Sequence, residues 1–72
     1  MNEYGVYINP YPNITGLSKS RIKSEARVKN FAWWVTGENE TDALDVFIST
    51  SNDPELLYNF YKSGAILIEE RN

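Results

Sequence analysis

The residues with the clearest chemical potential are the basic and aromatic side chains between Lys19 and Val35, in the stretch KSRIKSEARVKNFAWWV. Five of the seven basic residues of the chain lie there, and both tryptophans follow them. Cations beside exposed rings can hold single-stranded nucleic acid, because the cations neutralise phosphates and the rings stack on bases. Arginine, tyrosine and tryptophan also dominate protein interfaces. The residues that we expect to contact a partner are Arg21, Lys23, Arg27, Lys29, Trp33 and Trp34, with Tyr7 and Tyr11 nearby.

Catalytic and metal-binding chemistry has few candidates in this chain. There is no cysteine and no histidine, which removes the thiolate nucleophile, the commonest general base and two common metal ligands. Four carboxylates lie close together, but their spacing lacks the glycine and the distal glutamate of an EF-hand calcium loop; they are Glu38, Glu40, Asp42 and Asp45. We therefore predict a protein that is not an enzyme and that uses no cofactor and no metal.

The charge of the chain is unevenly distributed along the sequence. The formal net charge is -3 and the isoelectric point is about 4.7. Residues 1–36 carry five basic and two acidic side chains, whereas residues 37–72 carry two basic and eight acidic ones. The molecule is either electrically two-faced or pairs these charges across its surface as ordinary ion pairs.

These features favour a binding protein over other classes. Nucleic-acid-binding domains are usually basic, which this chain is not. We expect a small inhibitor or modulator that covers a surface of a larger protein, and its acidic half could compete for a site that normally accepts nucleic acid. The alternative is a single-stranded nucleic-acid-binding protein that uses the basic 19–29 stretch with Trp33 and Trp34.

Alternation of apolar and polar residues predicts strands. Tyr4, Val6 and Ile8 share one side of a strand predicted over 3–9, which two following prolines end. Further strands are predicted over 31–36 and 43–50, joined as a hairpin by a polar loop over 37–41. A last strand is predicted over 65–68.

The clearest helix signal follows the second half of that hairpin. Asp53 can cap a helix N-terminus, Pro54 suits its first position and Gly64 suits the residue after its end, so a helix is predicted over 54–63. Residues 17–29 are read either as a helix with a thin apolar face or as an extended strand with its basic residues on one side.

The predicted fold class is α+β, with a small antiparallel sheet of about four strands packed by the helix over 54–63. A second helix within 17–29 would make the order βαββαβ, the ferredoxin-like fold. At 72 residues the chain has room for a single domain over 1–72 with one small core. An exposed edge strand could pair with a copy of itself, so a monomer and a homodimer are both open.

The sequence shows no signal peptide and no apolar run long enough to span a membrane, so we expect a cytoplasmic protein with no membrane partner.

The layout of residues 31–71 resembles that of small phage-encoded proteins that bind and inhibit bacterial host machinery, such as RNA polymerase inhibitors and anti-CRISPR proteins. The shared features are size and element order: two strands joined by a polar turn, a Ser-Asn-Asp-Pro start to a short aromatic helix, and a glycine before a last apolar strand. The resemblance implies a stoichiometric inhibitor of a host protein without a cofactor. The basic stretch before Phe31 departs from the polymerase-inhibitor pattern.

Overall fold

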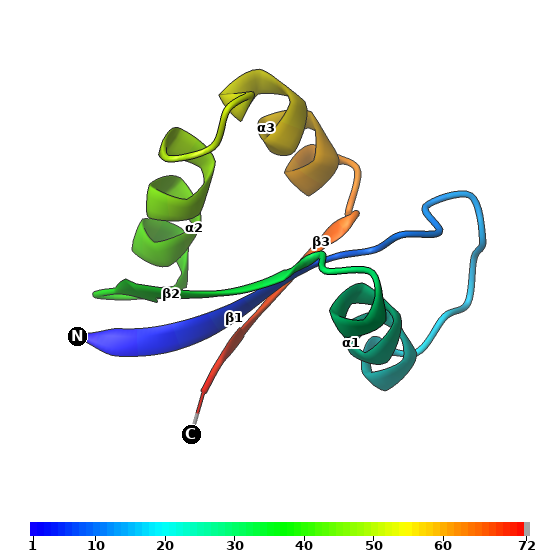
Figure 1. The fold of residues 1–72 in the computed structure, drawn as a ribbon. Coiled ribbons are helices and arrows are strands. Elements are labelled where there is room, and N and C mark those ends of the chain that lie inside the picture. Colours follow the sequence, from blue (N-terminus) through cyan, green and yellow to red (C-terminus); the bar gives the residue numbers. More distant parts are fainter. Residues whose placement is uncertain (72) are drawn as a thin grey trace.

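The computed structural model describes residues 1–71. They form a three-stranded antiparallel sheet and three helices (Figure 1). The elements in chain order are β1 (Asn2–Ile8), α1 (Lys19–Val28), β2 (Ala32–Gly37), α2 (Glu40–Ser49), α3 (Pro54–Lys62) and β3 (Ile66–Glu70). The strand order is β2-β1-β3, so β1 is the central strand and β2 and β3 are both edges.

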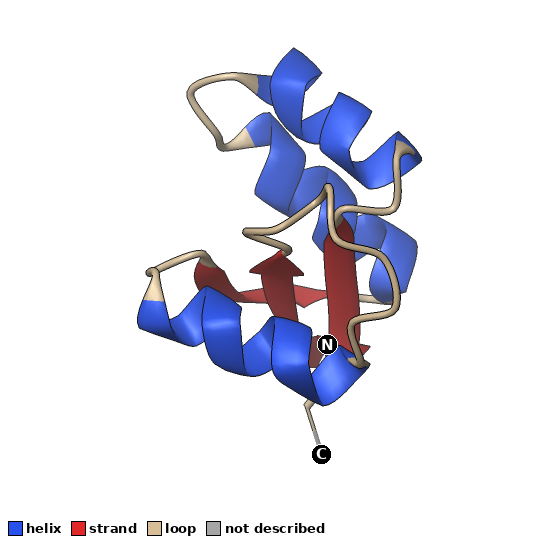
Figure 2. Ribbon diagram, turned by 90° about the vertical axis from the view of Figure 1, so that its right-hand side faces the viewer, coloured by secondary structure: helices blue, strands red, loops and turns tan. Residues whose placement is uncertain are grey.

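The sheet is covered on both faces, with α2 and α3 on one face and α1 on the other (Figure 2). Val6 of β1 lies opposite Trp33 of β2 and Ile68 of β3, so these three side chains point to the same face. That face meets α2 and α3, and the main core forms there from Val6, Leu44, Phe47 and Ile66. Val6, in the central strand β1, is completely buried.

The opposite face of the sheet packs against α1. Ala26 of α1 and Tyr7 of β1 are buried there. A Cβ atom at Gly5 would lie 2.7 Å from the Tyr7 hydroxyl, so the tyrosine ring occupies the space above this glycine. α1 covers only the end of the face at which β1 ends and β2 begins (Figure 1).

Several predicted elements are confirmed. The strand over 3–9 is β1, the strand over 31–36 is β2, the strand over 65–68 is β3, and the segment 17–29 contains the helix α1. The helix predicted over 54–63 is α3; Asp53 accepts a hydrogen bond from the Leu56 backbone N–H at 3.1 Å, and Gly64 has a φ of +82° just after its end.

The prediction of a strand over 43–50 is wrong, because this segment belongs to the helix α2. The loop over 37–41, predicted as a hairpin turn, contains the helix cap instead: the Asn39 side chain accepts a hydrogen bond from the Asp42 N–H at 2.9 Å. Apolar residues at Leu44, Val46 and Ile48 fit a strand, but Ala43, Leu44 and Phe47 fit one face of a helix equally well. These last three residues are the ones that are buried.

The fold class is therefore α+β as predicted, but the finer prediction changes. The sheet has three strands in place of about four, and three helices pack on it in place of one or two. The element order is βαβααβ, which is not the ferredoxin-like order. The reading of residues 17–29 as an extended strand is also wrong, since Ser18 caps α1 and Asn30, with a φ of +62°, ends it.

Candidate binding site

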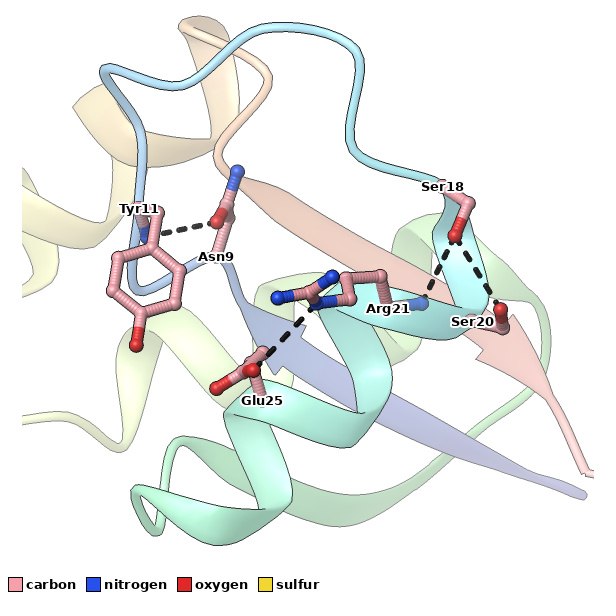
Figure 3. A network of polar contacts seen from close by, with 6 residues as sticks. All are labelled: Asn9, Tyr11, Ser18, Ser20, Arg21 and Glu25. Atoms are coloured by element: carbon pink, nitrogen blue, oxygen red, sulfur yellow. Dashed lines mark hydrogen bonds and ion pairs between the residues drawn. The ribbon is translucent and has the colours of Figure 1, made fainter.

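The predicted basic residues lie on and just after α1, and most of them contact a partner within the chain. The Lys23 ammonium lies 2.8 Å from a carboxylate oxygen of Glu69 in β3. Arg21 pairs with Glu25 one helical turn further on, at 3.6 Å (Figure 3). The exposure of Arg21 makes this second pair a weak one.

The two predicted tyrosines accompany these cations. The guanidinium of Arg27 lies 5.4 Å from the centre of the Tyr7 ring and donates a hydrogen bond to its hydroxyl at 3.3 Å. The Lys29 ammonium lies 5.6 Å from the centre of the Tyr11 ring. The Tyr11 N–H donates a hydrogen bond to the Asn9 side chain, two residues earlier in the chain (Figure 3). Tyr7 is buried and belongs to the packing of α1 on the sheet, not to an open surface.

The two tryptophans point to opposite faces of β2. Trp33 lies opposite Val6 on the face that meets α2, and its ring centre is 5.1 Å from that of Phe47. Trp34 lies opposite Gly5 on the α1 face, where the Arg71 guanidinium stands 4.9 Å from its ring centre. The structure therefore brings Trp34 to the same face as the basic helix but separates Trp33 from it.

Trp33 forms the floor of an apolar groove that opens beside the edge strand β2. The groove has a volume of about 570 Å³, and its other apolar walls are Phe47 at the end of α2 and Leu56 and Leu57 at the start of α3. Trp34 and Val35 line it from β2, and the polar segment 50–53 closes its rim. Leu56 is 46% exposed although it lies beside other apolar side chains, so the groove is open to solvent.

The rim formed by residues 50–53 is fixed by hydrogen bonds within this part of the chain. The Thr50 hydroxyl donates to the Val46 carbonyl at 2.8 Å, and the Ser51 hydroxyl donates to the Ile48 carbonyl at 2.8 Å. Asp53 then caps α3. These short-range contacts satisfy the free ends of both helices and set the position of α3 relative to α2.

The outer edge of β2, beside the groove, carries backbone N–H and C=O groups that do not pair with β1. The Ile8 N–H donates to the Phe31 carbonyl at 3.0 Å, so the bonded pairs of this antiparallel ladder continue at Val6 with Trp33 and at Tyr4 with Val35. The residues between them, Trp34 and Thr36, direct their N–H and C=O groups away from β1. β2 thus offers a free strand edge next to the groove.

The surroundings of the groove are acidic. No lysine or arginine occurs between Asn30 and Tyr61, whereas this part of the chain carries six carboxylates. Asp53 lies on the rim of the groove itself, with Glu55 two residues further on. The other four lie just before α2 and along it; they are Glu38, Glu40, Asp42 and Asp45. The charged residue in the lining of the groove is thus acidic, whereas Arg71, which stands over the Trp34 ring, lies on the opposite face of β2.

Two further observations bear on chemistry. In residues 1–71, no three acidic side chains come close enough together to hold a metal ion. Within the same residues, none of the helices has the length and the apolar character that crossing a bilayer requires.

Sequence reasoning missed three of the groove residues, Phe47, Leu56 and Leu57. Phe47 lies in the segment that was predicted as a strand, and Leu56 and Leu57 lie on the apolar side of the helix predicted over 54–63, where burial in the core is the ordinary expectation. The one signal for the groove was the short polar linker Ser51-Asn52 between two amphipathic helices, which forces them to meet at an angle over the sheet.

A comparison of the chain with models of known protein families, with curated proteins and with solved structures found no match. The layout that resembles phage-encoded inhibitors includes a strand over 43–50, and this segment is α2. The fold therefore adds no support to that resemblance.

Proposed function

We propose that this protein is a non-catalytic binding domain that takes up part of a larger protein in the groove between β2, α2 and α3. The observation that carries the proposal is the groove itself. It combines a half-exposed tryptophan, a phenylalanine and two leucines beside a free strand edge. Aromatic and aliphatic side chains around a central hollow are typical of the anchoring part of a protein interface.

The groove supports binding and gives no support to catalysis. Its polar rim consists of hydroxyl and amide side chains and the Asp53 carboxylate, which is already engaged as a helix cap. No second titratable side chain of residues 1–71 lines it. Because a general acid and base need two groups with matched geometry, we propose that the protein acts as a stoichiometric inhibitor or modulator that occupies its partner.

A pair of matched variants tests this function. Leu56 and Val46 are both helical, aliphatic and similarly exposed, at 46% and 41%, but only Leu56 lines the groove. The capture experiment uses three biotin-tagged proteins, the wild type, Leu56→Gln and Val46→Gln. Each is incubated with a lysate of the producing cells, and the amount of each captured protein is measured by mass spectrometry. We expect Leu56→Gln to lose at least about tenfold of the captured partner and Val46→Gln to retain it, because a truncated anchor residue usually costs more than about 1.4 kcal/mol.

Thermal melting of the three proteins is the control, since both substitutions should leave the fold intact. Equal capture by all three proteins would contradict the proposal, because the groove would then contribute nothing to binding.

The face that carries α1 supports a second candidate, single-stranded nucleic-acid binding. Lys19, Lys23 and Arg27 are spaced four residues apart on α1 and share one side of it. Trp34, 56% exposed, lies on the same face of the sheet. Against this candidate, Lys23 and Arg27 already have partners in Glu69 and Tyr7.

Fluorescent oligonucleotides at low and high salt test the second candidate. Nucleic-acid binding through α1 predicts an affinity that falls steeply with salt and is lost in the double variant Arg27→Glu/Lys29→Glu. Binding that survives this charge reversal, or no binding at low salt, eliminates it and leaves the groove as the site.

A further inference from the structure

We infer that the groove takes an extended peptide segment, which adds to β2 as a fourth strand and carries lysine or arginine beside a large apolar side chain. This inference rests on the proposed function and specifies the kind of segment that the partner presents. Three independent features of the groove lead to it: the free backbone edge, the apolar hollow beside that edge, and the sign of the charge on its rim.

The backbone edge sets the conformation of the bound segment. Trp34 and Thr36 each direct an N–H and a C=O group away from the sheet, as the register with β1 requires. Only a segment in the extended conformation presents matching groups at the same spacing, because strands in a sheet repeat these groups every second residue. Strand addition to an exposed edge is a common mode of peptide recognition.

The hollow sets which side chains the segment needs. It lies on one face of β2, the face of Trp33, so alternate side chains of an added strand point into it. A volume of about 570 Å³ accepts large aliphatic or aromatic side chains. The intervening side chains point to the opposite face, where Trp34 is exposed.

The charge around the hollow sets the remaining chemistry. Asp53 lies on the rim and Glu55 follows it in the first turn of α3, while the Arg71 guanidinium, 4.9 Å from the Trp34 ring centre, lies on the opposite face of β2. Lysine or arginine next to the apolar anchor would gain from this potential, whereas acidic residues there would be repelled.

A second copy of this chain fits the same edge less well. In a second copy paired through β2, the chain around that strand, residues 30–61, carries six carboxylates and no lysine or arginine. Such a segment does not complement the acidic rim of the groove. A segment with lysine or arginine does, so we assign the groove to a peptide strand of another protein.

The experiment begins with selection of a random dodecapeptide library, displayed on phage, against the immobilised protein. We expect the recovered peptides to combine apolar residues at alternate positions with lysine or arginine. The best peptide is synthesised and its affinity measured for wild type, Leu56→Gln, Val46→Gln and the double variant Asp53→Asn/Glu55→Gln. Asparagine keeps the cap of α3 while removing its charge, so the double variant isolates electrostatics. We expect about a tenfold loss for Leu56→Gln, a several-fold loss for the double variant at low salt and no loss for Val46→Gln.

N-methylation of the peptide, one residue at a time, then tests strand pairing. In an added strand every second N–H faces β2, so affinity should fall by at least about tenfold at alternate positions only. In the protein, the amide protons of Trp34 and Thr36 should exchange quickly when free and slowly when the peptide is bound, while that of Ile68 on the other edge stays unchanged.

The outcomes separate the two proposals. Peptides that depend on Leu56 but show no alternation on N-methylation, or that carry helical spacing or acidic residues, would overturn strand addition and leave the proposed function intact. Peptide binding that is equally tight in Leu56→Gln, or a selection that recovers no binding peptide, would also contradict strand addition. If the three biotin-tagged proteins also captured the same amount of partner from lysate, both strand addition and the proposed function would be overturned. Protection of Trp34 that rises with protein concentration in the absence of peptide would assign the edge to a second copy and overturn the inference.

Discussion

Replacing Gly37 by valine is expected to prevent stable folding. Gly37 ends β2 and is buried against the first turn of α2; a Cβ atom there would lie 2.6 Å from the Ala43 backbone nitrogen and 2.8 Å from its Cα. The obstacle is backbone and not the end of a flexible side chain, so the strand and the helix must move apart. Overpacking of this kind typically costs about 1–3 kcal/mol and sometimes more. A chain of this size has only about 4–10 kcal/mol of stability in total.

Urea unfolding followed by tryptophan fluorescence measures the effect. Gly37→Ala should lower the free energy of unfolding by about 2 kcal/mol or more, and Gly37→Val should leave little folded protein. Gly16→Ala is the control: Gly16 has a φ of +83° but no atom within 4 Å of the added carbon, so its cost should be about 1 kcal/mol from backbone strain alone. Equal costs at the two glycines would mean that β2 and α2 do not meet as described.

Leu44→Ala is expected to cost about 2–5 kcal/mol, whereas Val46→Ala should cost less than about 1 kcal/mol. Leu44 is 6% exposed and belongs to the core cluster, while Val46 is 41% exposed on the outer side of α2. If residues 43–50 formed a strand, the two side chains would share a face and a similar burial. The difference between their costs therefore reports directly on the helical structure of α2.

Thermal or urea unfolding of the two variants is the measurement, with far-UV circular dichroism to confirm that the fold is retained. Similar losses for both variants would contradict the helix and restore the strand that periodicity alone predicts.

The elements predicted correctly from the sequence are those whose short-range residue pattern fits only one type of secondary structure. α3 has a capping aspartate, a proline in its first turn and a glycine just after its end, and all three act as expected. β1 has Tyr4, Val6 and Ile8 at alternate positions and is followed by two prolines. In both cases the local signals were enough to decide between helix and strand.

The segment that became α2 was ambiguous for a physical reason. Leu44, Val46 and Ile48 recur at every second position, which indicates a strand, but the buried residues are Ala43, Leu44 and Phe47 at helical spacing. The deciding contacts are the Asn39 cap and the docking of Ala43 on Gly37, a contact between two elements. The helix replaces a predicted strand, and without that strand the ferredoxin-like order is lost.

The candidate site could be predicted only in part. Trp33 and Trp34 were identified from composition, but their separation onto opposite faces places one in the groove and the other beside the basic helix. The groove itself depends on how α2 and α3 are placed over the edge of β2. No single residue in the sequence indicates this arrangement. The basic residues looked free in the sequence, and their partners Glu69, Tyr7 and Tyr11 come from distant parts of the chain.

The central claim, that partners bind in the groove and not at the basic helix, is tested most directly by fluorine NMR of protein labelled with fluorotryptophan. The Trp33 ring packs against Phe47 in the groove, whereas Trp34 borders the groove but has its ring on the face that carries α1, so the relative size of the two changes distinguishes the two surfaces. We expect the Trp33 resonance to shift or broaden when lysate from the producing cells is added, with a smaller change at Trp34, and we expect Leu56→Gln to abolish the effect. A change confined to Trp34 would contradict the claim and assign binding to the face that carries α1.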